Sequence, residues 1–157
     1  MTARQRLAAL LSLLGLLPML TPAAAQQSAP LRWAVYYSDQ LPASAFADYD
    51  MVVFDGRHHP DLRPLQDRGV RLFGYINVGE VANYEPHYGL VQKMGLLGLQ
   101  NPSWPDSRMV DLRDPRWTEM VLNRLIPEVL RAGFDGIFLD TLDNAGYLER
   151  EDPKAYA

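Results

Sequence analysis

Cysteine is absent from the sequence, so disulfide bonds, thiolate zinc ligands and a cysteine nucleophile are excluded. Basic residues are also few, because 15 Lys and Arg stand against 19 Asp and Glu and form no cluster. An acidic chain without a basic patch is a poor binder of nucleic acid. We therefore expect a fold held together by its apolar core, with no nucleic-acid partner.

The chain also lacks an apolar run long enough for a membrane span, which takes about 20 residues. The longest run, residues 7–20, follows two arginines and precedes the alanines at 23–25. That order is typical of a secretory signal peptide. We predict that residues 1–25 are a signal peptide, that the protein is secreted or periplasmic without a stable membrane span, and that residues 26–157 form one domain. Cleavage after residue 25 would remove both arginines and change the net charge from −4 to −6.

Four short apolar runs alternate with stretches that have a helical pattern. Strands that are apolar on both faces are typical of parallel sheets covered by helices. The alternation predicts successive β-α units and an α/β fold. The four runs are Trp33–Tyr37, Met51–Phe54, Val70–Val78 and Ile137–Leu139.

The best-defined helix is expected between Asp114 and Ala132. Asp114 can cap the free N–H groups of the first turn. Pro115 occupies the first helical position, where the N–H group that proline lacks would have no partner in the helix. Gly133 can adopt the left-handed conformation that ends a helix. Pro127 removes one backbone hydrogen bond, so we expect a kink there.

Residues 81–108 are rich in proline, glycine and aromatic residues and are too long for a plain connection. Their aromatic residues argue against disorder, and we interpret the segment as one wall of a binding site. Residues 91–99 have a weak helical pattern. His87, within the segment, is expected at the surface, with contact to the substrate as the alternative.

Acidic residues follow the predicted strands at their carboxyl ends. Asp55, Glu80 and Asp140 come directly after strands, and Asp39 follows closely after the first. The carboxyl ends of parallel strands meet at one edge, where ligands bind. Each acid alone could simply cap the next turn. Together they favour a site, to which we also assign the nearby aromatic residues Tyr37, Tyr75 and Trp104.

Carboxylates beside aromatic rings suit a carbohydrate ligand. Cleavage of a glycosidic bond uses two carboxyl groups, one to protonate the leaving oxygen and one to attack or to activate water. Tyr75 and Trp104 can stack on sugar rings, and an acidic groove attracts a cationic aminosugar polymer. The chemistry needs no cofactor. His58, His59 and Asp61 could suggest a metal site, but no third imidazole and no thiolate follows at ligand spacing. We therefore expect no metal.

Three segments in order carry a family resemblance: Gly74–Glu80, Trp104 through Val110–Leu112 to Trp117, and Gly133–Asp143. The series resembles glycoside hydrolase family 114, the endo-α-1,4-polygalactosaminidase family, whose related domains occur in bacterial exopolysaccharide proteins. The resemblance implies a (β/α)₈ TIM barrel that hydrolyses a galactosamine-containing polysaccharide.

The resemblance also assigns roles to individual residues. Asp140 matches the catalytic aspartate, the nucleophile, while Asp55, Glu80 and Asp143 match acidic positions lining the cleft. Asn77 stands where the family more often has serine. The family's second catalytic carboxylate comes from a later strand.

A complete barrel of this kind takes about 200 residues or more. With four visible strand runs, we expect only the N-terminal half of a barrel, about four β-α units, which is inactive by itself. Two alternatives remain open: a non-catalytic polysaccharide-binding module, and a subunit of an exopolysaccharide export system.

Overall fold

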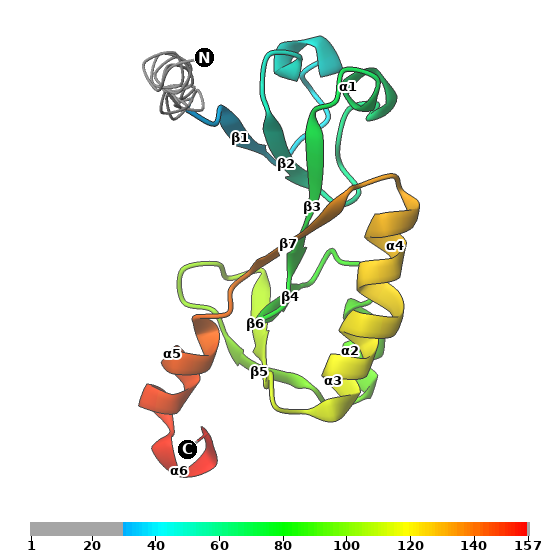
Figure 1. Cartoon of the computed structure of the whole chain (residues 1–157). Coiled ribbons are helices and arrows are strands. Elements are labelled where there is room, and N and C mark those ends of the chain that lie inside the picture. The colour runs from blue at the N-terminus through cyan, green and yellow to red at the C-terminus, as the bar shows by residue number, and fades with distance from the viewer. Residues whose placement is uncertain (1–29, 157) are drawn as a thin grey trace, which may run out of the picture. The chain divides into compact units, whose positions relative to one another are not determined.

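The computed structural model describes residues 30–156, so the predicted signal peptide at 1–25 lies outside the described residues. All four predicted strand runs are strands of one parallel sheet (Figure 1). In spatial order they are β1 (Trp33–Tyr36), β2 (Met51–Asp55), β3 (Arg71–Asn77) and β7 (Gly136–Asp140). The predicted α/β class is confirmed.

The order of these strands identifies the kind of α/β fold. Each parallel strand pairs with the next parallel strand along the chain, as consecutive strands do in a (β/α)₈ barrel. A doubly wound sheet would instead reverse its order at a switch point. Within residues 30–156, β1 and β7 are the two edges of the sheet. The order of the parallel sheet is therefore the order that consecutive strands of a (β/α)₈ barrel have.

The predicted long helix precedes β7 and packs against β3 and β7. It runs through α3 (Pro115–Met120), the π-helical turn η3 (Val121–Leu125) and α4 (Ile126–Arg131). Both predicted ends are confirmed, since Asp114 accepts the Arg116 N–H at 2.9 Å and Gly133 has a φ of 108°. A π-helical turn lies just before Pro127, where a kink is expected, since proline cannot donate the normal helical hydrogen bond.

The other connections in the parallel sheet are short. The 3₁₀ helix η2 (Ala43–Phe46) joins β1 to β2, and α1 (Arg63–Gln66) joins β2 to β3. After β7 the chain forms α5 (Asn144–Glu151) and α6 (Pro153–Tyr156). Within the part of the chain that the structure describes, no helix is long and apolar enough to cross a membrane.

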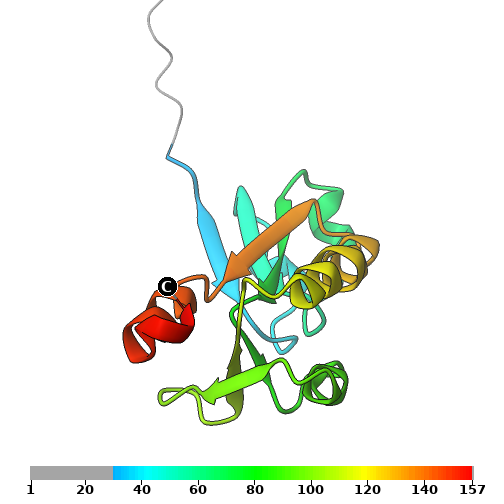
Figure 2. The ribbon, with the colours of Figure 1, turned by 90° about the horizontal axis from the view of Figure 1, so that it is seen from below.

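The segment after β3 is more ordered than a loop. It contains β4 (Glu80–Ala82), α2 (Tyr88–Lys93), β5 (Leu97–Gln100) and β6 (Ser107–Val110). These strands form an antiparallel sheet in the order β4-β6-β5, a layer separate from the parallel strands in Figure 2. The helix expected over residues 91–99 is wrong in its second half. Gly95, with a φ of 71°, ends the helical stretch, and the chain then pairs with β6.

The core lies where the long helix meets the sheet. Phe54, Leu72 and Trp117 are at most 1% exposed. Gly74 of β3 allows the helix to approach closely, because a Cβ at this position would lie 2.1 Å from the Val129 Cγ1. This packing holds β3 and β7 in place and thereby positions the residues at their carboxyl ends.

Candidate active site

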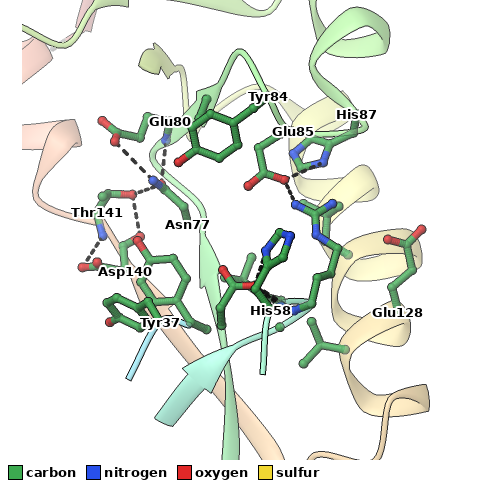
Figure 3. Close-up of a pocket in the computed structure, with 18 of the residues that line it drawn as sticks. Tyr37, His58, Asn77, Glu80, Tyr84, Glu85, His87, Glu128, Asp140 and Thr141 are labelled. Carbon is green, nitrogen blue, oxygen red and sulfur yellow. Dashed lines mark hydrogen bonds and ion pairs between the residues drawn. The ribbon is translucent and has the colours of Figure 1, made fainter. Parts of the chain in front are cut away.

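A cavity of about 730 Å³ opens at the carboxyl ends of the parallel strands. Six of the seven predicted site residues line it: Tyr37, Asp55, Tyr75, Glu80, Trp104 and Asp140. The parallel strands supply one side, while residues 82–107 of the inserted segment supply much of the other (Figure 3). The segment interpreted as a wall of the site therefore does border the cavity.

Asp140 lies at the end of β7 among two tyrosines and a backbone donor. The Thr141 N–H donates to its Oδ1 at 2.8 Å. The pKa of Tyr75 is raised far above its ordinary value. Burial is the largest cause, and a hydrogen bond to Asp140 is the second. Burial also raises the pKa of Tyr37, with further contributions from the charges of Asp140 and Asp55. Both carboxylates therefore lie close enough to Tyr37 to influence its phenol.

The tyrosine rings form a continuous aromatic surface beside these acids. The ring centroids of Tyr37 and Tyr75 are 4.6 Å apart, and those of Tyr75 and Phe138 are 6.4 Å apart with nearly parallel planes. Trp104, from the inserted segment, is 68% exposed. Tyr37 and Trp104 thus present accessible rings to a ligand in the cavity.

Asp55 both caps a turn and lines the cavity. Its Oδ1 accepts the N–H groups of Arg57 at 2.8 Å and His58 at 2.7 Å, and the His58 Nδ1 lies 3.3 Å from the same oxygen. Asp55 therefore has the turn-capping role that was the alternative for strand-end acids, and it also lines the cavity. Among residues 30–156, no three His, Asp or Glu side chains are grouped as metal ligands.

Glu80 is only 4% exposed, although it borders the cavity. The Asn77 amide donates to its Oε1 at 3.2 Å. Its Oε2 accepts the amides of Asn101 at 2.6 Å and Asn144 at 3.2 Å. Both carboxylate oxygens are thus engaged by asparagine side chains from three separate segments.

Asp143 and Asp39 do not line this cavity. Asp143 precedes α5 and is exposed, whereas the next residue, Asn144, is buried and bonds to Glu80. The expectation that Asp143 lines the cleft is not met by this cavity, because the start of α5 turns Asn144 inward instead. Neither Asn144 nor Thr141 was assigned a role from the sequence. Their signals were a position just after the Asp140 strand and, for Thr141, a place in the Gly133–Asp143 segment.

The cavity also has a charged end made by the inserted segment and the turn after β2. Arg57 forms an ion pair with Glu85, whose Oε2 lies 3.7 Å from the His87 Nδ1 (Figure 3). His87 is 8% exposed, so its predicted surface location is wrong. Burial, with the nearby charges of Arg57 and Arg124, lowers the pKa of His87 to about 4. The ring is therefore neutral at neutral pH.

Neighbouring parallel strands that bring carboxylates and aromatic rings to one cavity are the architecture of a barrel-type glycoside hydrolase. The family model of glycoside hydrolase family GH114 matches residues 18–155, and the chain belongs to this family.

Solved structures have a similar fold. Ega3 of Aspergillus fumigatus, solved in complex with galactosamine, has a TM-score of 0.66 at 20% identity, over 80% of this chain and 50% of that one. The glycoside hydrolase domain of PelA from Pseudomonas aeruginosa has a TM-score of 0.60 at 25% identity, over 80% of this chain and 57% of that one. The chain spans about half the length of each.

A sequence relative occurs in Thermotoga maritima, where an uncharacterized protein is 29% identical over 100 residues. The match covers 61% of this chain and 31% of the relative. The similar region is thus a minor part of that longer protein.

Proposed function

We propose that the protein is an exported glycoside hydrolase that cleaves a galactosamine-type polysaccharide, with Asp140 as the attacking carboxylate. The observation that carries this proposal is that Asp140 and Asp55 line one cavity together with the rings of Tyr37 and Tyr75. Membership of family GH114 supports the same class of reaction.

In the proposed reaction, a carboxylate oxygen of Asp140 attacks the anomeric carbon of the bound sugar. The bond to the leaving oxygen breaks as a second carboxyl group donates its proton to that oxygen. Water then hydrolyses the glycosyl-aspartate ester and returns the proton to the second group. In this proposal Asp140 is the attacking member of the pair. The chain spans about half the length of its solved neighbours.

The cavity suits an aminosugar for electrostatic and geometric reasons. Asp55 and Asp140 add negative charge close to the aromatic surface, which favours a cationic ammonium group. Tyr37, Tyr75 and Trp104 provide faces on which the apolar side of a sugar can stack. Galactosamine in the complex of Ega3 supports this substrate class.

Export is the second part of the proposal. It rests on the predicted signal peptide at residues 1–25, which would bring the protein to the periplasm or the exterior. Polysaccharide outside the cytoplasm is the substrate that such a location makes available.

Because the half-barrel is expected to be inactive by itself, the test is hydrolysis of α-1,4-linked galactosamine oligomers by the full-length protein that carries this chain and by its Asp140→Asn variant. We expect reducing ends to appear with the native full-length protein and to fall by roughly a thousandfold or more in the variant, since the nucleophile is lost. Asp48→Asn, at an exposed acid outside the cavity, is the matched control and should keep the native rate. Binding of oligomers without hydrolysis in all three proteins would contradict the proposal and support a polysaccharide-binding module.

A further inference from the structure

The residue after Asp140 has an unusual backbone conformation. Thr141 has a φ of 62°, and among the described residues it is the non-glycine residue with a positive φ. A β-branched residue strongly disfavours this region. Such conformations persist only where the surrounding structure imposes them, and they cluster at active sites. The contacts of Thr141 therefore need an explanation.

The Thr141 side chain connects the ends of β3 and β7. Its Oγ1 accepts the Gly79 N–H at 2.8 Å. The single hydroxyl proton can go to the Asn77 Oδ1 or to the Asp140 carbonyl, and both acceptors are within reach (Figure 3). The backbone also packs tightly, because a Cβ at Gly79 would lie 2.0 Å from the Thr141 carbonyl oxygen.

Asn77 is itself held by Glu80. The Asn77 Oδ1 accepts the Glu80 backbone N–H at 3.1 Å, while its amide donates to the Glu80 Oε1 at 3.2 Å. This pair of bonds orients the Asn77 oxygen toward the Thr141 hydroxyl. Since Glu80 also accepts the amides of Asn101 and Asn144, the arrangement is anchored in the inserted segment and in α5.

The result of this arrangement is a donor placed on Asp140. In its left-handed conformation, Thr141 directs its own N–H at the Asp140 Oδ1, 2.8 Å away. The hydroxyl that ties Thr141 to Gly79 and Asn77 thus acts on Asp140 through the backbone. A chain of hydrogen bonds runs from the buried Glu80 through Asn77 and Thr141 to Asp140.

We propose that Thr141 is a positioning residue for Asp140, and that Glu80 anchors it through Asn77 and is not a ligand for the sugar. The inference rests on the proposed function, because Asp140 is the nucleophile of that reaction. Holding a nucleophile in one orientation matters because a displacement of about 1 Å can cost a hundredfold in rate.

The experiment compares Thr141→Val, which removes the hydroxyl and keeps the branching, with Thr141→Ser, which keeps the hydroxyl. Thr118→Val is the matched control, since Thr118 is exposed in α3 and outside the cavity. The first measurement is amide hydrogen exchange by NMR in the full chain. We expect exchange at Gly79 and at position 141 to be about tenfold faster in Thr141→Val, and near native in Thr141→Ser and Thr118→Val.

The second measurement is steady-state hydrolysis of galactosamine oligomers by the full-length protein that carries this chain, with the same substitutions. We expect Thr141→Val to lower kcat by roughly 10- to 100-fold with little change in KM, because the nucleophile is displaced while the sugar contacts remain. Thr141→Ser should restore kcat. If Thr141→Val does not fold, Thr141→Gly also removes the hydroxyl and accepts the positive φ without strain.

The outcomes separate the two proposals. Native exchange at both amides in Thr141→Val, or faster exchange with an unchanged kcat, would overturn the positioning role. An inactive native full-length protein that binds no galactosamine oligomers would overturn the proposed function. Hydrogen exchange would still decide, in that case, whether Thr141 holds the end of β7 as inferred.

Discussion

Asn77 and Asp140 are register partners at the carboxyl ends of the neighbouring strands β3 and β7. Asp55 and Tyr75 are partners in the same way on β2 and β3. Strand register therefore sets the lateral order of the site, and a slip of one residue would turn these side chains to the other face. The core packing that holds the register also holds the site.

Replacing the exposed ring of Trp104 should weaken sugar binding without affecting folding. Trp104→Ala removes a stacking surface worth about 1 kcal/mol, so we expect roughly fivefold weaker binding of galactosamine oligomers in calorimetry. Trp33→Ala is the control, because Trp33 is 56% exposed and lies outside the cavity. Equal losses of affinity in the two variants would contradict a specific role for Trp104.

Gly74→Ala should destabilise the fold. The new Cβ would lie 2.1 Å from Val129 and 3.1 Å from the Phe134 ring, so the long helix must move away from β3. We expect a loss of about 1–3 kcal/mol in the free energy of unfolding, measured in urea. Gly89→Ala in α2 meets nothing within 4 Å and should stabilise the protein by up to about 1 kcal/mol. Similar destabilisation in both variants would show that close packing is not the cause.

The buried neutral His87 should make stability depend on pH in acid. Its pKa is lowered to about 4 in the folded protein, against about 6.5 when unfolded. Between these values only the unfolded chain binds the proton, so the free energy of unfolding should fall as the pH drops from 6.5 to 4. The fall attributable to this group is at most about 3 kcal/mol.

Urea unfolding between pH 7 and pH 4 checks this prediction with His87→Gln. We expect the variant to lose less stability over this range than the native chain, whatever its stability at pH 7. His58→Gln serves as the control, since that side chain is 67% exposed. A parallel pH dependence in the native chain and His87→Gln would contradict the assignment.

Glu80→Gln should disturb the buried network around Asn77, Asn101 and Asn144. A glutamine brings an NH₂ group against an asparagine amide, so at least one buried donor loses its acceptor. The expected cost is about 1–3 kcal/mol in the free energy of unfolding. Glu149→Gln, at an exposed position of α5, should be neutral. An unchanged unfolding midpoint in Glu80→Gln would show that the network contributes little to the fold.

Local patterns predicted the elements whose causes are themselves local. The apolar runs located all four parallel strands, and Asp114 and Gly133 located the ends of the long helix. Residues 97–99 were misassigned because a short apolar stretch fits a helix or a strand equally well. Only pairing with β6 decides between them.

The site divides in the same way into features with local causes, which the sequence predicted, and features that depend on distant segments, which it did not. The position of Asp55 and Asp140 at strand ends follows from the alternation of strands and helices. The burial of His87 depends instead on charged and aromatic neighbours from other segments, among them Arg57, Glu85 and Trp117. Likewise, a threonine gives no local sign of a positive φ, so Thr141 could not be recognised before its contacts with Gly79 and Asn77 were known.

The amino-acid sequence alone determined that parallel strands would deliver acids and aromatic rings to one edge, because hydrophobic patterning and chain direction are local properties. Tertiary structure decided how each acid is used. Asp140 borders the cavity beside two tyrosines, Glu80 is enclosed by three asparagines, and Asp143 is exposed. The reason is physical: the environment of a carboxylate depends on hydrogen-bond donors and buried surface contributed by distant segments, and these come together only when the chain folds.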